Sequence, residues 1–515
     1  MTTARKVLSN TLFQISGRLI TAVLGIAVVK ILSTYLGKEG YGEYVTVFVF
    51  LSYFGIAADL GLFTMAVREM SKTPAKIPYI FGNVLGLRLF LAICSMGLAV
   101  LVAFVLPFFL ENWHGTKIPL GVAVAAIGTV FSIMSGTVSS LLQVNYKMKY
   151  ETLGLIVNKV VAVSYMVYVA YIAYSGQMEK GFYQVLWGGV AASFCMLLVT
   201  ASAASKLSPL RMRFDFSFWR ELFFQSLPFG VALVLNVFYF KLDVMLLSFM
   251  RGSEEVGIYG VPMKMLEVIY FLPVYFMNSM LPVISREVTL REKHGENAGI
   301  NRILQYAFDF MVLCAAPMLV GGFVLAYPIV FLISNPEYLS RLADGFYGSD
   351  IALKILLFAM FFSFINAMFG IVLVTLNKQK RLMWINFVGV IVNLTLNLIS
   401  IPFWGFRGAA IASVISVVVV VLLTSRSVKK ALQLRLSYLP SLKIVICALA
   451  MGATVYGLRG FTYALWQNAN VFLLIPVGGA VYVGMLFLTG VVNREMIKTM
   501  FRKEPVSEEG RLITD

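Results

Sequence analysis

Apolar runs of about twenty residues recur along the whole chain, and they constrain its fold more than any other feature. A helix of that length spans about 30 Å, which is the thickness of the hydrocarbon core of a bilayer. Within hydrocarbon every backbone polar group must be bonded inside the protein, so each run predicts a membrane-spanning helix. We count fourteen runs, with approximate bounds 12–33, 44–66, 80–107, 119–142, 152–174, 183–204, 222–249, 256–283, 303–333, 351–376, 384–404, 408–425, 442–459 and 471–492.

The overall composition supports this class of protein. Hydrophobic residues make up 59% of the 515 residues and charged residues only 13%, whereas a soluble domain is about half apolar and a quarter charged. No loop between the runs is long enough to fold as a soluble domain. We therefore predict an all-α polytopic membrane protein with about fourteen transmembrane helices.

Cysteine and histidine are too sparse to build a metal centre or a histidine-based catalytic site. The four cysteines lie inside the apolar runs and form no CxxC pair, and the two histidines, His114 and His294, lie in loops on opposite predicted sides. We expect no cofactor and no enzymatic activity. A membrane glycosyltransferase would need paired carboxylates, and its best candidates, Glu39 and Glu43, are better explained as turn residues.

The distribution of positive charge predicts how the chain is oriented. The net charge is +17, and 28 of the 42 lysines and arginines lie in alternate loops, against 7 in the loops between them. This alternation is what the positive-inside rule requires if both termini of a multi-pass membrane protein are cytoplasmic. The basic loops therefore indicate topology and contact with anionic membrane lipids, and no nucleic-acid partner is expected.

Two pairs of similar stretches indicate an internal repeat. LGKEGYGEY at 36–44 matches RGSEEVGIY at 251–259, and GLIVN at 154–158 matches GVIVN at 389–393. Both pairs relate one span to the sixth span after it, and because six is even the two halves point the same way across the membrane. Parallel repeats of this kind are typical of transporters that bind substrate between two rocking lobes. The alternative is a duplicated scaffold without a transport path.

The repeat divides the chain into three parts. We predict an N-terminal six-helix lobe over residues 1–210, a C-terminal six-helix lobe over 211–432, and two additional transmembrane helices with a cytoplasmic tail over 433–515.

Charged residues inside the spans mark the candidate site. An ionised side chain at the bilayer centre costs about 3 kcal/mol, so these residues are expected to face the interior of the bundle. They are the cations Arg18, Lys30, Arg88, Lys159, Lys241, Lys264 and Lys354 and the acids Asp59, Asp243, Glu267 and Asp309. Four of them (Lys30, Lys159, Asp309 and Lys354) lie near span ends, where snorkelling or a loop contact is a sufficient explanation.

The remaining cations predict an anion-binding cavity. Arg18, Arg88, Lys241 and Lys264 are expected to surround an anionic group, with arginines suited to bidentate phosphate binding and lysines acting as point charges. The alternative for the seventh and eighth spans is a static salt-bridge lock.

Three acids are the candidates for coupling or gating: Asp59, Asp243 and Glu267. Asp243 lies about 200° around the helix from Lys241, so each of these two needs a partner elsewhere, whereas Lys264 and Glu267 share a helix face. Asp59 either carries a coupling ion or holds Arg18 in place.

Several stretches resemble one known family. LGKEGYGEY, FGIAADLGL at 54–62, YFKLDVMLLSFMRGSEEVGIYGVPMKM at 239–265 and NLTLNLISIPFWGFRGAAIAS at 393–413 are similar to the polysaccharide transporter family of Wzx-type lipid-linked oligosaccharide flippases. That family belongs to the multidrug/oligosaccharidyl-lipid/polysaccharide exporter superfamily.

The resemblance implies a flippase of the cytoplasmic (inner) cell membrane. Such a protein moves a polyprenyl-diphosphate-linked oligosaccharide, a precursor of polysaccharide, O-antigen or capsule, from the inner to the outer leaflet by alternating access through a basic central cavity. The implied partners are the lipid-linked glycan and a polysaccharide polymerase or glycosyltransferases of the same pathway. The driving force is left open among H⁺, Na⁺ and the membrane potential. The alternative is a cation-coupled multidrug or small-molecule antiporter of the same superfamily, against which the excess of cations in the spans argues.

Overall fold

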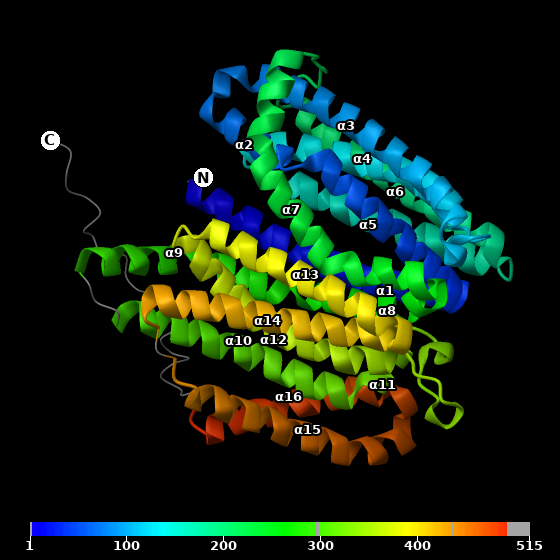
Figure 1. The fold of residues 1–515 in the computed structure, drawn as a ribbon, viewed down its shortest axis with the longest axis vertical. Helices are drawn as coiled ribbons and strands as arrows, with labels where there is room; N and C mark the ends of the chain where they lie inside the picture. The colour runs from blue at the N-terminus through cyan, green and yellow to red at the C-terminus, as the bar shows by residue number, and fades with distance from the viewer. Residues whose placement is uncertain (1–2, 295–297, 435, 492–515) are drawn as a thin grey trace.

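The computed structural model describes residues 3–294, 298–434 and 436–491, and over these residues it is built of helices (Figure 1). No strand occurs in these ranges beyond one isolated bridge between Arg341 and Phe346. The predicted all-α fold is confirmed. The predicted tail after residue 491 lies outside the described residues.

Sixteen α-helices are described, joined by short turns. They are α1 Thr3–Asp59, α2 Leu62–Lys72, α3 Ile77–Val105, α4 Ile118–Val144, α5 Lys149–Tyr168, α6 Met178–Ser205, α7 Phe216–Arg251, α8 Ser253–Ile269, α9 Phe271–His294, α10 Ala298–Val324, α11 Ala326–Ile333, α12 Ser349–Thr375, α13 Gln379–Trp404, α14 Phe406–Leu432, α15 Leu439–Trp466 and α16 Val471–Leu488.

Most of these helices are long and apolar enough to cross a membrane. Twelve described stretches meet this test, and a thirteenth is added if the two parts of α7, bent by 45°, form one span. Helix α1 counts once, although its 57 residues would reach roughly 85 Å at 1.5 Å per residue, far more than a bilayer needs. The predicted number of fourteen is thus approximate.

The first predicted span and most of the second lie within α1, which ends at Asp59, and a glycine separates the two. Gly37 has a φ of 67° and a ψ of −175°, so two helical segments meet at this residue. A positive φ is accessible to glycine without the steric penalty that a Cβ brings. This residue therefore allows the chain to leave one helix and begin the next without an intervening loop.

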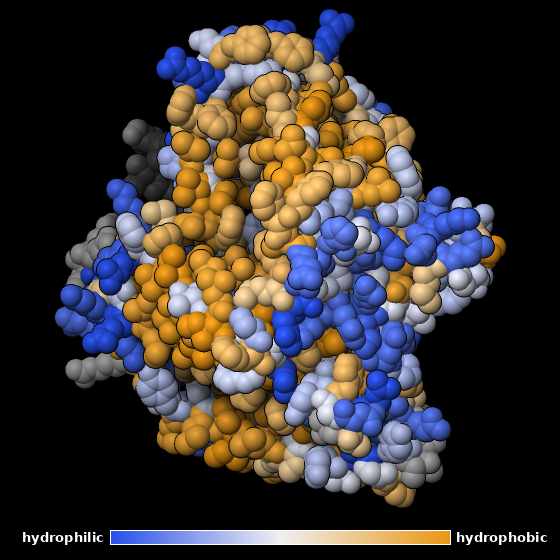
Figure 2. All heavy atoms as spheres, turned by 45° about the vertical axis from the view of Figure 1, so that its right-hand side comes forward, coloured by the Kyte–Doolittle hydropathy of each residue, from blue (hydrophilic) through white to orange (hydrophobic). Residues whose placement is uncertain are grey.

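The helices are grouped into two lobes with an appended pair (Figure 1). Helices α1 to α6 pack mainly against one another, as do α9 to α14, and α8 packs mainly on α1 of the first lobe. At the far edge α15 packs on α10, and α16 packs on α15. On the face shown in Figure 2, a broad band of hydrophobic residues separates the hydrophilic residues at its two sides. An apolar band of this kind is the surface that a bilayer would cover.

Helix α7 connects the two lobes and touches both. Trp219 and Leu222 near its start are buried in a cluster with residues of α2, α3 and α4. Val244 and Leu247 near its end are buried in the main core. The first turns of α7 therefore pack with the N-terminal lobe, and the predicted boundary at 210/211 stays a prediction.

The segment before α7 is fixed to α3 by close backbone contact. The amide of Arg213 donates to the carbonyl of Gly82 at 3.0 Å. A Cβ at Gly82 would lie 2.5 Å from the carbonyl oxygen of Arg211, and one at Gly86 would lie 2.6 Å from that of Arg213. Glycine at these two positions is what lets the linker lie directly on the helix.

Asp215 completes this attachment. Its carboxylate caps α7 by accepting from the amides of Ser217 and Phe218, and its own amide donates to Asn83 at 2.9 Å. The hydroxyl of Tyr79 on α3 also donates to this carboxylate. The hydrogen bonds that the carboxylate accepts, with that of Tyr79 as the largest cause and those of the Phe218 and Ser217 amides after it, lower the pKa of Asp215.

Candidate functional site

The two lobes meet by direct backbone contact at one end of the bundle, which we call the Gly37 end. A Cβ at Gly42 would lie 1.7 Å from the carbonyl oxygen of Ser253, and one at Gly257 would lie 2.0 Å from that of Lys38. In the sequence repeat Gly42 corresponds to Gly257 and Lys38 to Ser253. The two contacts are therefore equivalent, and the glycines of the repeated motif are the points where α1 and α8 touch.

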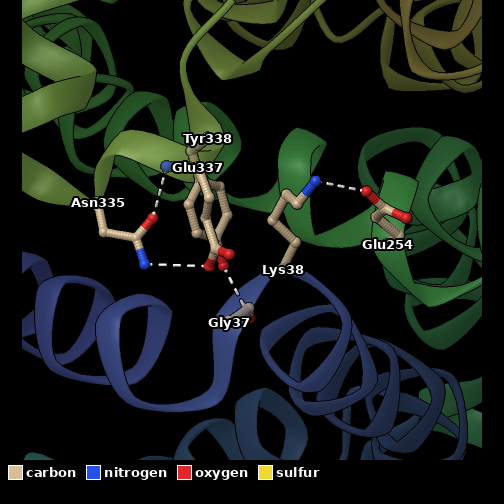
Figure 3. Close-up of polar contacts among 6 residues, drawn as sticks. All are labelled: Gly37, Lys38, Glu254, Asn335, Glu337 and Tyr338. Carbon is tan, nitrogen blue, oxygen red and sulfur yellow. Dashed lines mark hydrogen bonds and ion pairs between the residues drawn. The ribbon is translucent and has the colours of Figure 1, made fainter. Parts of the chain in front are cut away.

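Polar contacts around Gly37 reinforce this closure (Figure 3). Lys38 of α1 forms an ion pair with Glu254 of α8, with 2.5 Å between Nζ and Oε1. The hydroxyl of Tyr338 donates to the carbonyl of Gly37 at 2.9 Å. Burial raises the pKa of Tyr338 well above its usual range, so this hydroxyl remains a protonated donor.

The segment 334–338 follows α11 of the second lobe and lies along α1 of the first. Lys30 donates to the carbonyl of Ser334, and the side-chain amide of Asn335 donates to that of Ser33 at 3.4 Å. Of the two explanations expected for Lys30, snorkelling or a loop contact, the structure shows the loop contact. Together with Tyr338, these contacts tie the two lobes to each other at the Gly37 end.

A charged cavity of about 450 Å³ lies between the lobes. Arg18 of α1, Lys241 of α7, and Lys264 and Glu267 of α8 line it. An adjoining cavity of about 260 Å³ is also lined by Lys241, Lys264 and Glu267. The fold thus brings together three of the four predicted cations and one of the three predicted acids.

These charged side chains face open space. Lys264 and Glu267 form an ion pair at 2.6 Å, yet their side chains keep 46% and 45% of their accessible surface. The Cζ atom of Arg18 lies 5.7 Å from the ring centroids of both Phe271 and Tyr275, and these cation–π contacts connect α1 with α9 at the cavity. Ionised groups with this much free surface need water or a ligand around them, since hydrocarbon cannot solvate them.

Lys159 of α5 lines both cavities, although its position near a span end led us to expect snorkelling or a loop contact. It directly follows the repeated GLIVN stretch. This position next to a repeated stretch was the one sequence signal that could have marked Lys159 as a cavity residue. The signal was not sufficient, because the packing of α5 against α1 decides which side of α5 faces the cavity.

Arg88 and Asp59 form a separate ion pair in the N-terminal lobe. Nη2 of Arg88 lies 2.7 Å from Oδ1 of Asp59, and the two side chains are 5% and 24% exposed. The ion-pair partner of Asp59 in the described part of the chain is therefore Arg88, and not Arg18. Arg88 does not line either charged cavity, and its predicted role in substrate binding stays a prediction.

Asp243 points away from the charged cavity, as its angular separation from Lys241 requires. It is buried, and it accepts hydrogen bonds from the hydroxyls of Tyr259 and Ser413, the latter at 2.9 Å. It lines a cavity of about 40 Å³, which is large enough for a water molecule. Phe240, Met263 and Tyr270 line both this small cavity and the charged one.

A metal centre is not found in the ranges that the structure describes. No group of three or more His, Cys, Asp or Glu side chains there is arranged to hold an ion.

Two protein-family models match the chain. The model described as "Polysaccharide biosynthesis protein" matches residues 7–288, more than half of the chain, and the model described as "MatE" matches residues 228–399.

Curated relatives occur in Haloferax volcanii. The "Probable flippase AglR" is 25% identical over 51% of this chain and 53% of its own length. The "Probable low-salt glycan biosynthesis flippase Agl15" is 21% identical over 60% of this chain and 63% of its own length. The chain thus spans between half and two thirds of the length of these relatives.

A solved structure described as "Lipid II flippase MurJ, inward closed conformation" shares the fold. Its TM-score is 0.72 at 17% identity, covering 95% of this chain and 100% of that one.

We expect Arg88→Met to destabilise the protein by roughly 3–5 kcal/mol, because it leaves the Asp59 carboxylate without its buried partner. The double variant Arg88→Met with Asp59→Leu should recover most of this loss, since no unpaired charge remains. Thermal unfolding in detergent measures both. Lys72→Met, which breaks the exposed pair with Glu69, is the control and should cost under about 1 kcal/mol. A double variant as unstable as Arg88→Met would contradict this account.

We expect Gly42→Val to separate the lobes at the Gly37 end, because its side chain would overlap the Ser253 carbonyl. Spin labels at Glu179 and Asp344, both exposed, should move apart in pulsed electron paramagnetic resonance. Gly136→Val is the matched control, since nothing lies within 4 Å of a Cβ there. Equal distance distributions for both variants would refute the role of Gly42.

Proposed function

The chain belongs to the polysaccharide biosynthesis protein family, and from this premise we propose that it is a flippase for a polyprenyl-diphosphate-linked oligosaccharide. It would carry this lipid from the inner to the outer leaflet of the cytoplasmic membrane. The observation that carries the proposal is the cavity between the lobes, where Arg18, Lys159, Lys241 and Lys264 are found with one acid, Glu267.

The charge of this cavity suits a diphosphate. A diphosphate that crosses the low-dielectric interior needs fixed positive groups in place of water. Glu267 is paired with Lys264, so the four cations and one acid of the lining keep a net charge of +3 to neutralise a ligand. Lys264 would then exchange its carboxylate partner for a phosphate oxygen. The cavity volume of about 450 Å³ lies within the usual range of roughly 300–1,000 Å³ for small-ligand sites.

The residues that line this cavity support the competing antiporter function less well than they support a flippase. A pocket for organic cations would present acids, whereas four cations face a single carboxylate here. Both curated relatives and the solved structure carry the word "flippase" in their names, which agrees with the function that the cavity charge favours.

Transport would proceed by alternating access between the lobes 1–210 and 211–432. We assign the Gly37 end to the outer face and the basic loops to the cytoplasm, with both termini, on the positive-inside rule. The contacts between Gly42 and Ser253 and between Gly257 and Lys38 would then close the outer end. Rocking the lobes would separate these contacts and release the glycan outside.

Asp243 is our candidate for ion coupling. It is a buried carboxylate whose small cavity shares Phe240, Met263 and Tyr270 with the charged cavity. Binding of H⁺ or Na⁺ at this carboxylate would change the charge next to these shared walls, and so the packing of α7 and α8. Glu267 would gate through its exchangeable pair with Lys264, and Asp59 through its pair with Arg88.

We expect Arg18→Ala, Lys241→Ala and Lys264→Ala each to slow glycan export by about 10- to 100-fold, the cost of losing one charge-assisted contact to phosphate. The readout is the lipid-linked glycan that accumulates in cells in which this chain is the sole flippase, at matched protein levels. Lys354→Ala is the control lysine, because its ammonium lies over the Phe323 ring at 5.5 Å. Normal export by all three cavity variants would refute the proposal.

We expect Asp243→Asn to transport at less than about a tenth of the wild-type rate in proteoliposomes and to lose its response to an imposed H⁺ or Na⁺ gradient, because asparagine cannot change charge. Asp309→Asn is the matched control. Asp309 accepts hydrogen bonds from Gln305 and Ser441 and should remain gradient-responsive. Undiminished stimulation of Asp243→Asn by both gradients would remove Asp243 from the coupling path.

A further inference from the structure

The smaller of the two adjoining cavities has an aromatic wall. Tyr41, Tyr44 and Phe48, on successive turns of α1, line this cavity of about 260 Å³. The rings of Tyr44 and Phe48 are 4.8 Å apart between centroids. Tyr41 stacks behind Tyr44 at 6.3 Å with an interplanar angle of 15°, which fixes the orientation of the Tyr44 ring.

This wall is not filled by protein. Phe48 keeps 39% of its accessible surface although it lies between the lobes. Within the described residues, the hydroxyl of Tyr44 has no hydrogen-bond partner. Tyr44 is itself half-buried, whereas a core aromatic pair would be packed on both sides. The open ring faces and the free hydroxyl therefore indicate a ligand surface.

The chemistry of the wall fits a sugar ring. A pyranose presents a face of C–H bonds, which packs on the negative face of an aromatic ring, and a rim of hydroxyls, which need hydrogen-bond partners. Tyr44 and Phe48 supply the ring faces. The Tyr44 hydroxyl and the Glu267 carboxylate, which lines the same cavity, supply polar partners.

The order of the groups along the cavities matches the order of groups in a lipid-linked glycan. Arg18 lines only the larger cavity, Lys159, Lys241 and Lys264 line both, and the aromatic wall lines only the smaller one. Arg18 is nineteen residues before Gly37 in α1, or about 28 Å along the helix, whereas Tyr41 already contacts Tyr338 of the Gly37 end. A lipid that enters near Arg18 places its diphosphate among the lysines and its sugar deeper.

We propose that Tyr44 and Phe48 form a subsite for the sugar unit attached to the diphosphate. This inference rests on the proposed flippase function and adds to it a residue-level division between phosphate and sugar binding. The small volume suits one or two sugar rings. Because stacking uses the C–H face, the subsite should accept hexoses that differ in the orientation of one hydroxyl.

The test compares the affinities of the purified full-length protein for two kinds of probe. One is undecaprenyl diphosphate, and the other is the same lipid with a single glucose, galactose or N-acetylglucosamine. We expect the wild-type protein to bind at least one glycosylated probe about fivefold more tightly than the bare lipid. In Tyr44→Leu and Phe48→Leu this ratio should fall to about one, because the stacking face is lost.

Three further variants separate the subsite from folding and from the phosphate site. Tyr44→Phe keeps the ring and should keep most of the ratio. Lys241→Ala should weaken binding of both probes while keeping the ratio near five. Phe131→Leu removes a ring from a pair with Phe194, at 5.3 Å, outside both cavities, and should retain the wild-type ratio.

The outcomes distinguish the two proposals. A ratio that persists in both leucine variants, or a wild-type ratio of one for all three sugars, overturns the sugar subsite while binding of the bare lipid still supports the flippase. Failure of the wild-type protein to bind any of these lipids overturns both.

Discussion

The free-energy cost of placing an ionised side chain in hydrocarbon determines how the charged residues inside this protein are arranged. Each intramembrane charge must be paired, hydrogen-bonded or hydrated, since a group left facing acyl chains costs about 3 kcal/mol or more. The structure shows all three solutions. Arg88 and Asp59 are paired in one lobe, Asp243 is buried among hydroxyl donors in the other, and the cations around Lys241 share an open cavity. Among these three, the open cavity is the one with room for a ligand as large as a diphosphate, and this is why it is the candidate substrate site.

The closure of the cavity at one end depends on how near two helix backbones can approach. Gly42 and Gly257 admit the facing carbonyls at distances that no Cβ would allow. Because the two contacts are equivalent under the internal repeat, loosening one is expected to loosen the other. The segment 334–338 reinforces this closure through hydrogen bonds to α1. Such a closure holds through many weak, reversible contacts, which suits a gate better than a single strong bond would.

The cavity and the closed end together suggest how binding and motion are linked. The aromatic wall that we assign to sugar lies on the same turns of α1 that carry the closing contacts, since Tyr41 and Tyr44 flank Gly42. A glycan bound against this wall would act directly on the segment that has to move. The cations that we assign to phosphate binding lie farther along α1 and on α5, α7 and α8, where they would hold the lipid while that segment rearranges.

The sequence by itself determined the membrane class and the helical fold, because apolar length and composition are local properties that hydrocarbon enforces on any packing. The parallel repeat stays a prediction from the repeated motifs. It also placed Lys264 and Glu267 on one helix face and Lys241 opposite Asp243, since helix geometry fixes those relations. Only the tertiary structure decided which charges share a cavity. The pairing of Arg88 with Asp59, the entry of Lys159 into the cavity and the union of two predicted spans in α1 all depend on contacts between segments far apart in the chain. Such contacts are set by how whole helices pack, and the charge of a residue does not reveal which neighbour will face it.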